Sequence, residues 1–505
     1  MIFNKFKYLF IFIVITALNN NCFSQITDTI SVRHNVTLKE AHTGSLEIDT
    51  MLLNSYKIVP SHIRQFYLDA RNIFQKSETD FTNKQIIEAA LNNELNLMGG
   101  PMLGDLKPDG VSIWFRPSNK TPLTINVIET GSKKEQIFVL NPDLAGEVQR
   151  VIVNGLSPKT EYNYRVLSKG TVVKKGTFIT APTNDDKSRV RLAFGSGFHK
   201  IGLHNPNLIH TITKRNPHAM ILLGDIAVDD RENNLSMHRS DYLLRDLSRP
   251  WQELAANTVI YASWDDHDYL NNDLSGIPEG FTEKNREELR SLWRTNWNNP
   301  PNDVDGIYFN TRIGQVDIIM LDTRSCRKIQ DRGKYASYLG VEQLEWLKNT
   351  LRKSNAPFKV ISSGTMWSDY ISNGKDSWGT WDALAREEIF DLIEKENISG
   401  VLLISGDRHG ARGFTIPRKS GFKFHEFQVA SLGGVPGPGA MAQDQTNQLF
   451  GYQGKGLKAF GEFTFDTKDT KPQVTFRLID EIGNILEEYT LPYEKLTPFK
   501  QEKTD

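Results

Sequence analysis

Cysteine is scarce in this chain of 505 residues. Its two cysteines, Cys22 and Cys326, exclude a disulfide-stapled scaffold and any zinc module built on four thiolates. An excess of one charge sign is also absent, because 60 basic residues face 61 acidic ones. The resulting net charge of −1 offers no basic field, so we expect no nucleic-acid-binding module. Hydrophobic residues make up 39% of the chain, which excludes wholesale disorder.

A long apolar run that resembles a membrane segment occurs only near the N-terminus. Lys5 and Lys7 precede residues 8–18, which are apolar but too few to span a bilayer comfortably. Cys22 and Ser24 then supply the small residues of a cleavage site. We therefore predict a secretory signal peptide over residues 1–24, no stable membrane anchor, and export to the periplasm or the medium. An uncleaved anchor is the alternative, and the asparagines before Cys22 argue against lipidation.

Two patterns of different period follow the predicted signal peptide. Residues 25–98 carry helical apolar spacing over 63–74 and 83–98, and we interpret them as a helical lead-in. Residues 99–183 instead contain short strand patterns separated by turns, which predict a small fibronectin-like β-sandwich domain. The strands expected in this domain are residues 111–115, 123–128, 148–153, 162–166 and 176–180.

Strand and helix patterns alternate from residue 186 onward. The strands are continuous apolar runs, which fit strands covered on both faces. They predict a layered α/β domain over residues 186–492, followed by a tail over 493–505. The buried strands expected here are residues 219–225, 258–263, 316–321, 358–362 and 401–405.

Polar residues gather directly after several of these strands. The clusters are Gly224-Asp225, residues 264–268, residues 321–324 and residues 406–409. Ligands of open α/β sheets bind beyond the carboxyl ends of the strands. We therefore expect the clusters to converge in space, although each one alone could be an ordinary turn.

Three acidic residues of these clusters suggest a chemistry. In one crevice Asp225, Asp266 and Asp407 would raise one another's pKa, a cost that bound cations relieve. Carboxylates and imidazoles together suit divalent or trivalent metals, and two such ions activate water and clamp an in-line displacement. Arg324 and Arg327 could present forked donors to phosphate oxygens, or they could be surface ion-pair residues. The pattern indicates metal-assisted hydrolysis of phosphate esters.

The motif set resembles the PhoD-like alkaline phosphatases, a branch of the calcineurin-like metallophosphoesterases. The resemblance rests on Asp225, residues 264–268, Leu321-Asp322-Thr323-Arg324 and Gly406-Asp407 with His409, and it covers about residues 99–483. It implies an α/β fold class with a four-layer α/β/β/α catalytic core. It also implies two or more bound metal ions, of a kind (Ca, Fe, Zn, Mn or Mg) that the sequence leaves open.

The resemblance also implies roles for single residues. Asp225 would bridge two metals, with Asp266, Asp407 and His409 as further ligands. His267 would stabilise the transition state or act as general acid, and Asp268 would orient it. Arg324 and Arg327 would lie near the phosphate. A metal-bound hydroxide would attack the phosphate ester in line.

The sequence departs from the family at two positions. Many members have Ser-Cys where this chain has Ser196-Gly197, and a tyrosine where it has Val228; both missing groups bind the same metal, ferric iron in the best-understood members. We hypothesise that His199 and Asp229 compensate and hold the first metal with Asp225 and His409. The alternative is that His199 caps the following helix and Asp229 begins a solvated loop. Asn272 would contact substrate or stabilise the turn after His267.

The function predicted from these observations is an exported, metal-dependent alkaline phosphatase or phosphodiesterase acting on a phosphate ester. The competing hypothesis is a degenerate metallophosphoesterase that serves as a non-catalytic extracytoplasmic binding protein, and the missing cysteine and tyrosine motivate it. A serine hydrolase is disfavoured, because no Gly-x-Ser-x-Gly elbow follows a predicted strand.

Overall fold

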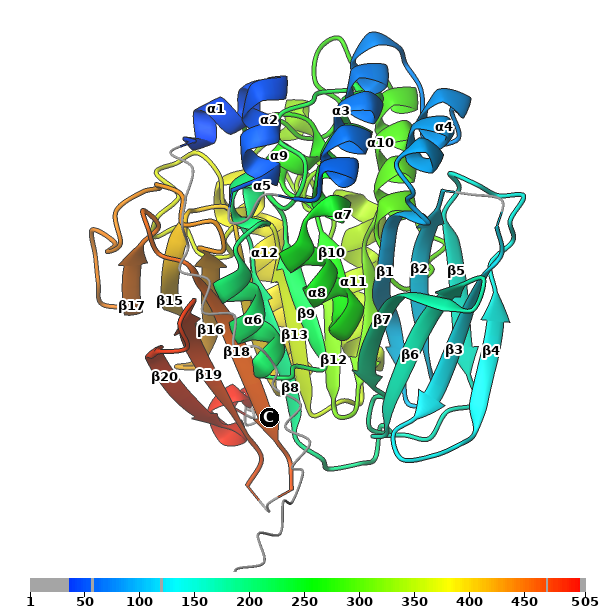
Figure 1. Cartoon of the computed structure of the whole chain (residues 1–505). Helices are drawn as coiled ribbons and strands as arrows, with labels where there is room; N and C mark the ends of the chain where they lie inside the picture. Colours follow the sequence, from blue (N-terminus) through cyan, green and yellow to red (C-terminus); the bar gives the residue numbers. More distant parts are fainter. Residues whose placement is uncertain (1–35, 56–58, 119–120, 469–470, 500–505) are drawn as a thin grey trace, which may run out of the picture.

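The computed structural model describes residues 36–55, 59–118, 121–468 and 471–499. The predicted signal peptide, residues 1–24, lies outside the described residues. Helices of the N-terminal segment lie at the top of the molecule in Figure 1, a β-sandwich lies at its right, and two large sheets fill the centre.

The described part of the N-terminal segment contains four helices, and buried side chains such as Phe66 and Tyr67 pack them against Leu243 and Leu244 of the central region. The helices are α1 (Leu38–Thr43), α2 (Leu46–Leu53), α3 (Ser61–Lys76) and α4 (Lys84–Asn92). The helix predicted over 83–98 is too long, because α4 ends at Asn92 and a strand begins at Leu97. Gly99, Gly100 and Pro101 belong to that strand, and such residues disfavour a helix.

The β-sandwich consists of a three-stranded sheet, β1-β2-β5, and a four-stranded sheet, β4-β3-β6-β7. Its strands are β1 (Leu97–Lys107), β2 (Gly110–Pro117), β3 (Leu123–Glu129), β4 (Glu135–Val139), β5 (Gln149–Asn154), β6 (Glu161–Ser168) and β7 (Thr171–Ile179). The five predicted strands are present. The prediction missed β1, whose glycines and proline hide its strand pattern, and β4, whose side chains are half-buried or exposed.

Two sheets form the centre of the molecule, and both are largely parallel near the middle. The six-stranded sheet has the order β10-β9-β8-β18-β19-β20, with β8 (Val190–Gly195), β9 (Ala219–Leu223), β10 (Val259–Ser263), β18 (Ala459–Asp466), β19 (Gln473–Asp480) and β20 (Ile485–Pro492). The seven-stranded sheet has the order β11-β12-β13-β14-β16-β15-β17, with β11 (Phe309–Ile313), β12 (Val316–Met320), β13 (Phe358–Ser363), β14 (Val401–Ser405), β15 (Gly410–Pro417), β16 (Lys423–Ala430) and β17 (Gln448–Gln453).

The inner faces of the two sheets pack on each other through aromatic side chains. Phe427 of the seven-stranded sheet stacks on Phe476 of the six-stranded sheet, with ring centroids 4.1 Å apart. Both side chains are fully buried, and burying one phenylalanine contributes about 1.5–3 kcal/mol. This apolar interface fixes the two sheets relative to each other, so the loops at their shared edge are held in place.

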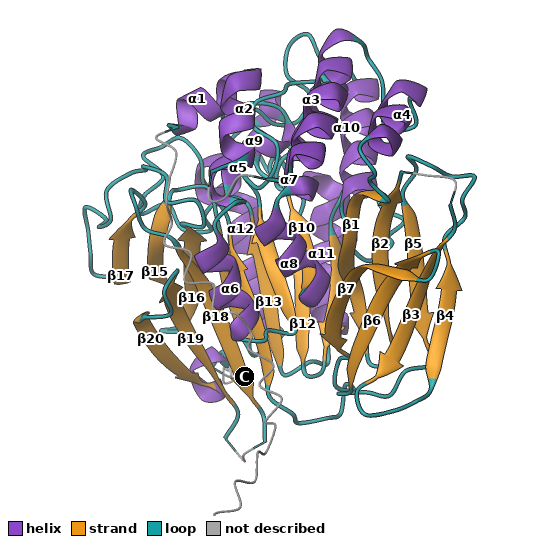
Figure 2. Cartoon of the chain, in the orientation of Figure 1, coloured by secondary structure: helices purple, strands orange, loops and turns teal. Residues whose placement is uncertain are grey.

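Helices cover the outer faces of both sheets and complete the predicted four-layer α/β/β/α fold (Figure 2). Buried residues of α6 and α8 pack on the six-stranded sheet, and those of α11 and α12 pack on the seven-stranded sheet. The remaining helices are α5 (His199–Gly202), α6 (Pro206–Lys214), α7 (Leu235–Leu247), α8 (Arg249–Asn257), α9 (Asp266–Tyr269), α10 (Glu283–Asn296), α11 (Gly340–Lys353), α12 (Trp378–Lys395), η1 (Ile329–Asp331) and η2 (Tyr493–Leu496). No helix within the described ranges has the length and apolar character needed to cross a membrane.

Candidate metal centre

The predicted polar clusters meet at the carboxyl ends of the central strands. The segment after β8 carries His199, the loop after β9 carries Asp225, and α9 after β10 carries Asp266 and His267. His409, which follows β14 of the other sheet, completes the group. Residues from four strand ends and both sheets therefore lie together, as the sequence predicted.

Several residues of this centre have a left-handed backbone that non-glycine residues rarely adopt. Their φ angles are +45° for His199, +53° for Asp225, +53° for Asp230 and +61° for Asp407. Each such residue costs on the order of 1 kcal/mol, and residues of this kind cluster at functional sites. Gly224 permits the close approach of the segment that follows β10, because a Cβ there would lie 2.3 Å from Cβ of Asp265.

His199, His409 and Asp225 form the most compact part of the centre. The Nε2 atoms of the two histidines lie 3.2 Å apart, and Nε2 of His199 lies 3.9 Å from Oδ2 of Asp225. Nδ1 of His199 lies 3.0 Å from Oδ1 of Asp229, and Nδ1 of His409 lies 2.6 Å from the carbonyl oxygen of Pro436. Both Nδ1 atoms thus face an oxygen that can only accept a hydrogen bond.

These contacts assign the tautomers of the two histidines. Burial lowers the pKa of His199, and burial also lowers the pKa of His409 to about 3, so both rings are neutral near pH 7. A neutral ring that donates through Nδ1 carries a lone pair on Nε2. The two Nε2 lone pairs therefore face each other, and a cation between them would turn this repulsion into two bonds. Histidine ligands of metals commonly donate their other N–H to a carboxylate or carbonyl in this way.

A second cluster contains Asp225, Asp266 and His267, whose possible ligand atoms all lie within 4.8 Å of one another. Burial, together with the charges of Asp266 and Asp265, raises the pKa of Asp225 well above its usual range. Burial acts on Asp266 in the same sense, but Arg324 and His267 hold the pKa of that carboxyl below its usual range. Asp225 Oδ1 has no hydrogen-bond partner among the described residues, so this oxygen is available to a cation.

Asp407 lies beside these clusters and joins none of those found among the described residues. Burial and the nearby charges of Asp265 and Asp376 raise the pKa of Asp407 well above its usual range. Its Oδ2 atom also has no hydrogen-bond partner within the described part of the chain. The structure therefore places Asp407 in the same acidic neighbourhood, on the side of Asp265 and Asp376.

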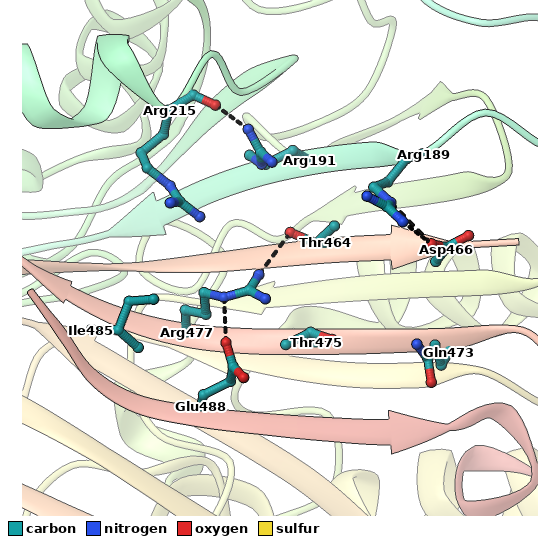
Figure 3. A pocket seen from close by; sticks show the side chains of 10 residues that line it. All are labelled: Arg189, Arg191, Arg215, Thr464, Asp466, Gln473, Thr475, Arg477, Ile485 and Glu488. Carbon is teal, nitrogen blue, oxygen red and sulfur yellow. Dashed lines mark hydrogen bonds and ion pairs between the residues drawn. The ribbon is translucent and has the colours of Figure 1, made fainter. Parts of the chain in front are cut away.

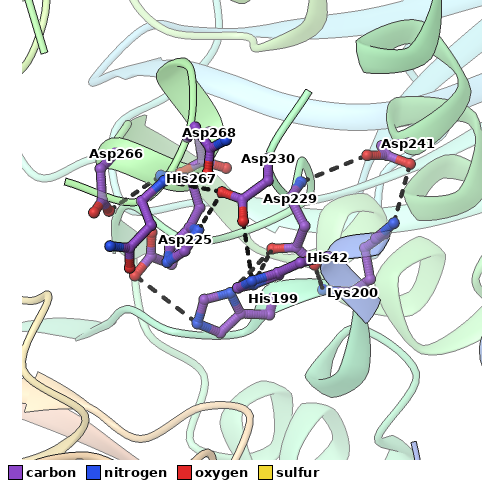
Figure 4. Close-up of polar contacts among 12 residues, drawn as sticks. His42, His199, Lys200, Asp225, Asp229, Asp230, Asp241, Asp266, His267 and Asp268 are labelled. Carbon is purple, nitrogen blue, oxygen red and sulfur yellow. Dashed lines mark hydrogen bonds and ion pairs between the residues drawn. The ribbon is translucent and has the colours of Figure 1, made fainter. Parts of the chain in front are cut away.

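The carboxylate that contacts the ring of His267 is that of Asp230, whereas the sequence analysis expected Asp268 (Figure 4). Nδ1 of His267 lies 2.6 Å from Oδ1 of Asp230. Asp268 instead accepts hydrogen bonds from the backbone N–H groups of Ile226 and Ala227, at 3.0 and 3.3 Å. Asp268 thus fixes the loop that follows β9, and Asp230 orients His267.

Charge also favours a proton on His267. Burial alone would lower the pKa of His267, but the carboxylates of Asp266, Asp230 and Asp225 raise it well above its usual range. Burial would raise the pKa of Asp230, but hydrogen bonds from His267 and His42 lower it to about 2. The pair is therefore an imidazolium held by a carboxylate.

Asp229 lies on the Nδ1 side of His199, away from the facing Nε2 atoms. Its Oδ2 atom also accepts a hydrogen bond from the backbone N–H of Lys200, at 3.2 Å. Burial would raise the pKa of Asp229, but the hydrogen bond with His199 and the charges of His199 and His42 hold it below its usual range. The geometry therefore favours an orienting role for Asp229 over the ligand role that we hypothesised from the sequence.

The two arginines predicted to contact phosphate are both buried. Arg324 pairs with Asp265 through Nε, and its Nη1 lies 2.9 Å from Oδ2 of Asp376. Nη1 of Arg327 lies 3.1 Å from Oδ1 of Asp376, and the guanidinium group of Arg327 packs against the ring of Trp381. The Nη2 atom of each arginine makes no hydrogen bond to the described residues. Of the two arginines, Arg324 borders the candidate metal-binding clusters, because its Nη2 atom lies 3.8 Å from Oδ1 of Asp266. Arg327 lies behind it in an aromatic pocket.

Two other sequence-predicted features border the centre. Asn272 is exposed, and its backbone N–H donates to Oδ1 of Asp230 at 3.1 Å. The glycine- and proline-rich segment 433–439 supplies the Pro436 carbonyl that holds His409. A Cβ on Gly437 would lie 2.5 Å from Cβ of His409, so only glycine permits this contact.

Sequence reasoning assigned no role to His42, Asp230, Asp265 and Asp376, although Asp265 belongs to the predicted cluster 264–268. His42 comes from α1, and its Nδ1 and Nε2 atoms lie 3.1 Å from Oδ2 of Asp230 and 3.7 Å from Oδ1 of Asp229. The side chain is 16% exposed, and its ring centroid lies 4.4 Å from that of His267. Asp230 and Asp265 adjoin predicted residues and could have been found from that position, whereas nothing in the sequence around His42 signals the site.

Two cavities lie away from this centre. One of about 420 Å³ lies beside the six-stranded sheet, near the start of β8, and is lined by Arg189, Arg191, Arg215 and Arg477 (Figure 3). The metal centre lies beyond the opposite end of β8. The arginines are paired with acidic residues, as in the contact of 2.6 Å between Arg477 and Glu488. The other cavity, of about 560 Å³, lies between the N-terminal helices, the sandwich and α10.

Comparisons with known proteins agree with this geometry. Residues 221–476, half of the chain, match the family model described as PhoD-like phosphatase. Alkaline phosphatase D of Bacillus subtilis is 26% identical over an alignment of 220 residues, and the match covers 37% of this chain. The match spans 36% of that relative's own length, about a third of it.

Two solved structures share the fold. The structure of PhoD covers 78% of this chain and 92% of its own chain, with a TM-score of 0.61 and 18% identity. The structure of purple acid phosphatase PPD1 from yellow lupin seeds covers 78% of this chain and 75% of its own chain, with a TM-score of 0.56 and 14% identity. The family model, the four-layer fold and the clustered motifs agree, and the chain belongs to the PhoD-like phosphatase family.

Proposed function

We propose that this protein hydrolyses phosphate esters with the help of bound metal ions. The single observation that carries the proposal is the pair of facing Nε2 lone pairs of His199 and His409 beside Asp225, a buried arrangement that a cation would stabilise. Membership of the phosphatase family supports the reaction class. The competing hypothesis of a degenerate binding protein is weaker, because such a protein has no need to keep this donor set.

The donor atoms suggest how two ions would be held. His199, His409 and Asp225 would hold the first ion, with His199 in place of the cysteine that many family members use. Asp225 and Asp266 would hold a second ion, with Asp407 close by. Two nitrogens and several carboxylate oxygens suit a transition metal and a harder cation respectively, so the ions would come from Fe, Zn, Mn, Ca or Mg. Bound ions of this kind activate water and neutralise charge on phosphate oxygens.

Residues of the chain would perform the other tasks. His267, held as an imidazolium by Asp230, would donate a proton from Nε2 to the leaving-group oxygen. Arg324 would place its Nη2 group near a phosphate oxygen, since that nitrogen borders Asp266. Asp268 and Asp229 would act indirectly, by holding the loop after β9 and the ring of His199.

We further propose that the protein is exported after removal of residues 1–24, which the charge and apolar pattern of the N-terminus supports. The helical lead-in over 25–98, the sandwich over 99–183, the catalytic domain over 186–492 and the tail over 493–505 remain our proposed division. The separate sheets of the sandwich and the catalytic region support its main boundary.

The proposed reaction is tested with p-nitrophenyl phosphate as a monoester and its bis-ester as a diester. We expect turnover by the purified protein, loss of turnover on chelation, and recovery when a metal is added back. Asp225→Asn should lose metal and lower kcat by several orders of magnitude, since it removes a charge shared by both ions. Full turnover in Asp225→Asn, or in metal-free protein, would contradict the proposal.

A further inference from the structure

The N-terminal helices reach the catalytic centre. The family match begins at residue 221, whereas α1 and α2 lie at the top of the molecule, above α5 and α9 (Figure 1). His42, in the last turn of α1, is the one described residue of this segment that enters the His/Asp clusters. It belongs to two of them, one with His199 and Asp229, the other with Asp230 and His267.

One carboxylate joins His42 to His267. Oδ1 of Asp230 lies 2.6 Å from Nδ1 of His267, and Oδ2 of the same carboxylate lies 3.1 Å from Nδ1 of His42 (Figure 4). Because an ionised carboxylate only accepts hydrogen bonds, both Nδ1 atoms must donate to it. The two oxygens of Asp230 are therefore each held by one imidazole, and the plane of the carboxylate is fixed from both sides.

Buried ion pairs hold α2, the helix that directly follows α1 and His42, in place. Asp49 of α2 lies 3.1 Å from Nζ of Lys200 and 2.8 Å from Nε of Arg71, and all three side chains are buried. Arg231 pairs with Asp241 at 2.7 Å and lies against Gly44, the cap of α1. Lys200 directly follows His199 and Arg231 directly follows Asp230. The N-terminal segment is thus anchored to the two loops that carry the centre.

We propose that His42 is a positioning residue of the catalytic centre, which acts through Asp230 to fix the ring of His267. This inference rests on the proposed function. With His42 present, Asp230 cannot rotate away from Nδ1 of His267, and the ring of His267 keeps its place beside Asp225 and Asp266. The N-terminal helices are then part of the catalytic machinery, in addition to their role in packing.

Two substitutions of His42 distinguish the role of its Nδ1 atom from that of its Nε2 atom. The amide NH₂ of asparagine lies near the position of Nδ1 of histidine, whereas that of glutamine lies near Nε2. We expect His42→Ala to lower kcat by about 10- to 100-fold with little change in KM, as for other residues that orient a catalytic group. His42→Asn should restore most of kcat, and His42→Gln should not. Metal content, measured by mass spectrometry, should equal that of the wild type in all three variants.

His62→Ala is the matched control, because His62 is an exposed histidine of the same N-terminal segment. It should leave kcat, KM and metal content unchanged. Wild-type kcat in His42→Ala would overturn the inference, and so would rescue by glutamine together with failure of asparagine. Loss of metal in His42→Ala would also overturn it, because His42 would then be a ligand. None of these results bears on the proposed function, which is tested separately by metal-dependent turnover of the wild type and by the loss of turnover in Asp225→Asn.

Proton NMR tests the same inference independently of enzyme activity, by observing the Nδ1 proton of His267. The hydrogen-bonded Nδ1 proton of His267 gives a downfield signal, which is assigned by its absence in His267→Gln. We expect that signal to shift or broaden by exchange in His42→Ala and to return in His42→Asn. A signal unchanged by His42→Ala would show that Asp230 holds His267 without His42, and the inference would be wrong.

Discussion

The Nε2 atoms of His199 and His409 face each other across 3.2 Å, although the residues are separated by 210 positions in the chain. His199 follows a strand of one sheet and His409 a strand of the other, so the contact spans the two sheets. Asp229 and the carbonyl of Pro436 fix the opposite edges of the rings. A metal-free centre therefore holds two lone pairs together, and we expect metal binding to contribute to stability as well as to catalysis.

Chelation should lower the melting temperature of the wild type, because a ligand that binds only the folded state stabilises it by mass action. At a free metal concentration 100 times its Kd, the contribution is about 2.7 kcal/mol. His409→Ala should reduce the effect of chelation on the melting temperature, because it removes one donor to the first ion and leaves Asp225 and Asp266 for the second. His210→Ala serves as the control, since His210 is an exposed side chain of α6. An unchanged melting temperature of the wild type after chelation would contradict the prediction that metal bound at this centre stabilises the fold.

His267→Asn should lower the rate of phosphate ester hydrolysis in a way that depends on the leaving group. Loss of a general acid costs about 10²- to 10⁴-fold when the leaving oxygen needs a proton. We expect a large loss of kcat for an alkyl phosphate and a small loss for p-nitrophenyl phosphate, whose leaving group is stable as an anion. Equal losses for the two substrates would assign His267 a binding role in place of proton donation.

Asp49→Ala should destabilise the fold, because it leaves Lys200 and Arg71 buried with one partner fewer. Removing one member of a buried ion pair costs about 3–5 kcal/mol. The free energy of unfolding, measured with urea, should fall by this amount, and Glu47→Ala on the exposed face of α2 should change it little. A loss no larger than that of the control would mean that the N-terminal segment is not anchored by these ion pairs.

Acid should destabilise the protein between pH 6.5 and pH 4, in part through His218. Burial lowers the pKa of His218 to about 4, from 6.5 in an unfolded chain, and its Nδ1 accepts a hydrogen bond from the N–H of Arg191. The unfolded state therefore binds the proton first, and stability present above pH 6.5 is lost as the pH falls. At pH 5 this loss is on the order of 1–2 kcal/mol.

The acid effect is checked with His218→Asn, whose side-chain oxygen can accept the same hydrogen bond without titrating. Urea unfolding at pH 7 and pH 5 should show a smaller difference in this variant than in the wild type. His425, whose pKa burial also lowers to about 4, should account for a further part of the difference. Identical pH dependence in wild type and His218→Asn would contradict this assignment.

The layered fold and the core of the centre could be predicted from the sequence. Apolar runs such as residues 219–225 indicate strands covered on both faces. Acidic residues directly after such strands are costly to bury without a partner, so they point to a function. Asp225, Asp266 and His409 therefore signalled the centre from their positions alone. The structure brings them together, as the rule on the carboxyl ends of strands requires.

Residues that act by orienting others could not be predicted in this way. His42 lies in a short helix, and only the packing of α2 and α3 on α7 brings it to Asp230. The choice between Asp268 and Asp230 as the partner of His267 depends on the path of the loop after β9, which no local pattern reveals. Arg327 likewise carries a motif position, yet its aromatic neighbours hold it behind Arg324.

The central claim is most directly tested by crystals of the protein with bound metal, measured at the absorption edge of that metal. An anomalous difference map should show a peak within bonding distance of Nε2 of His199, Nε2 of His409 and Oδ2 of Asp225. Crystals of His409→Ala should lack that peak. A map of metal-loaded protein with no anomalous density between the two histidines would contradict the account.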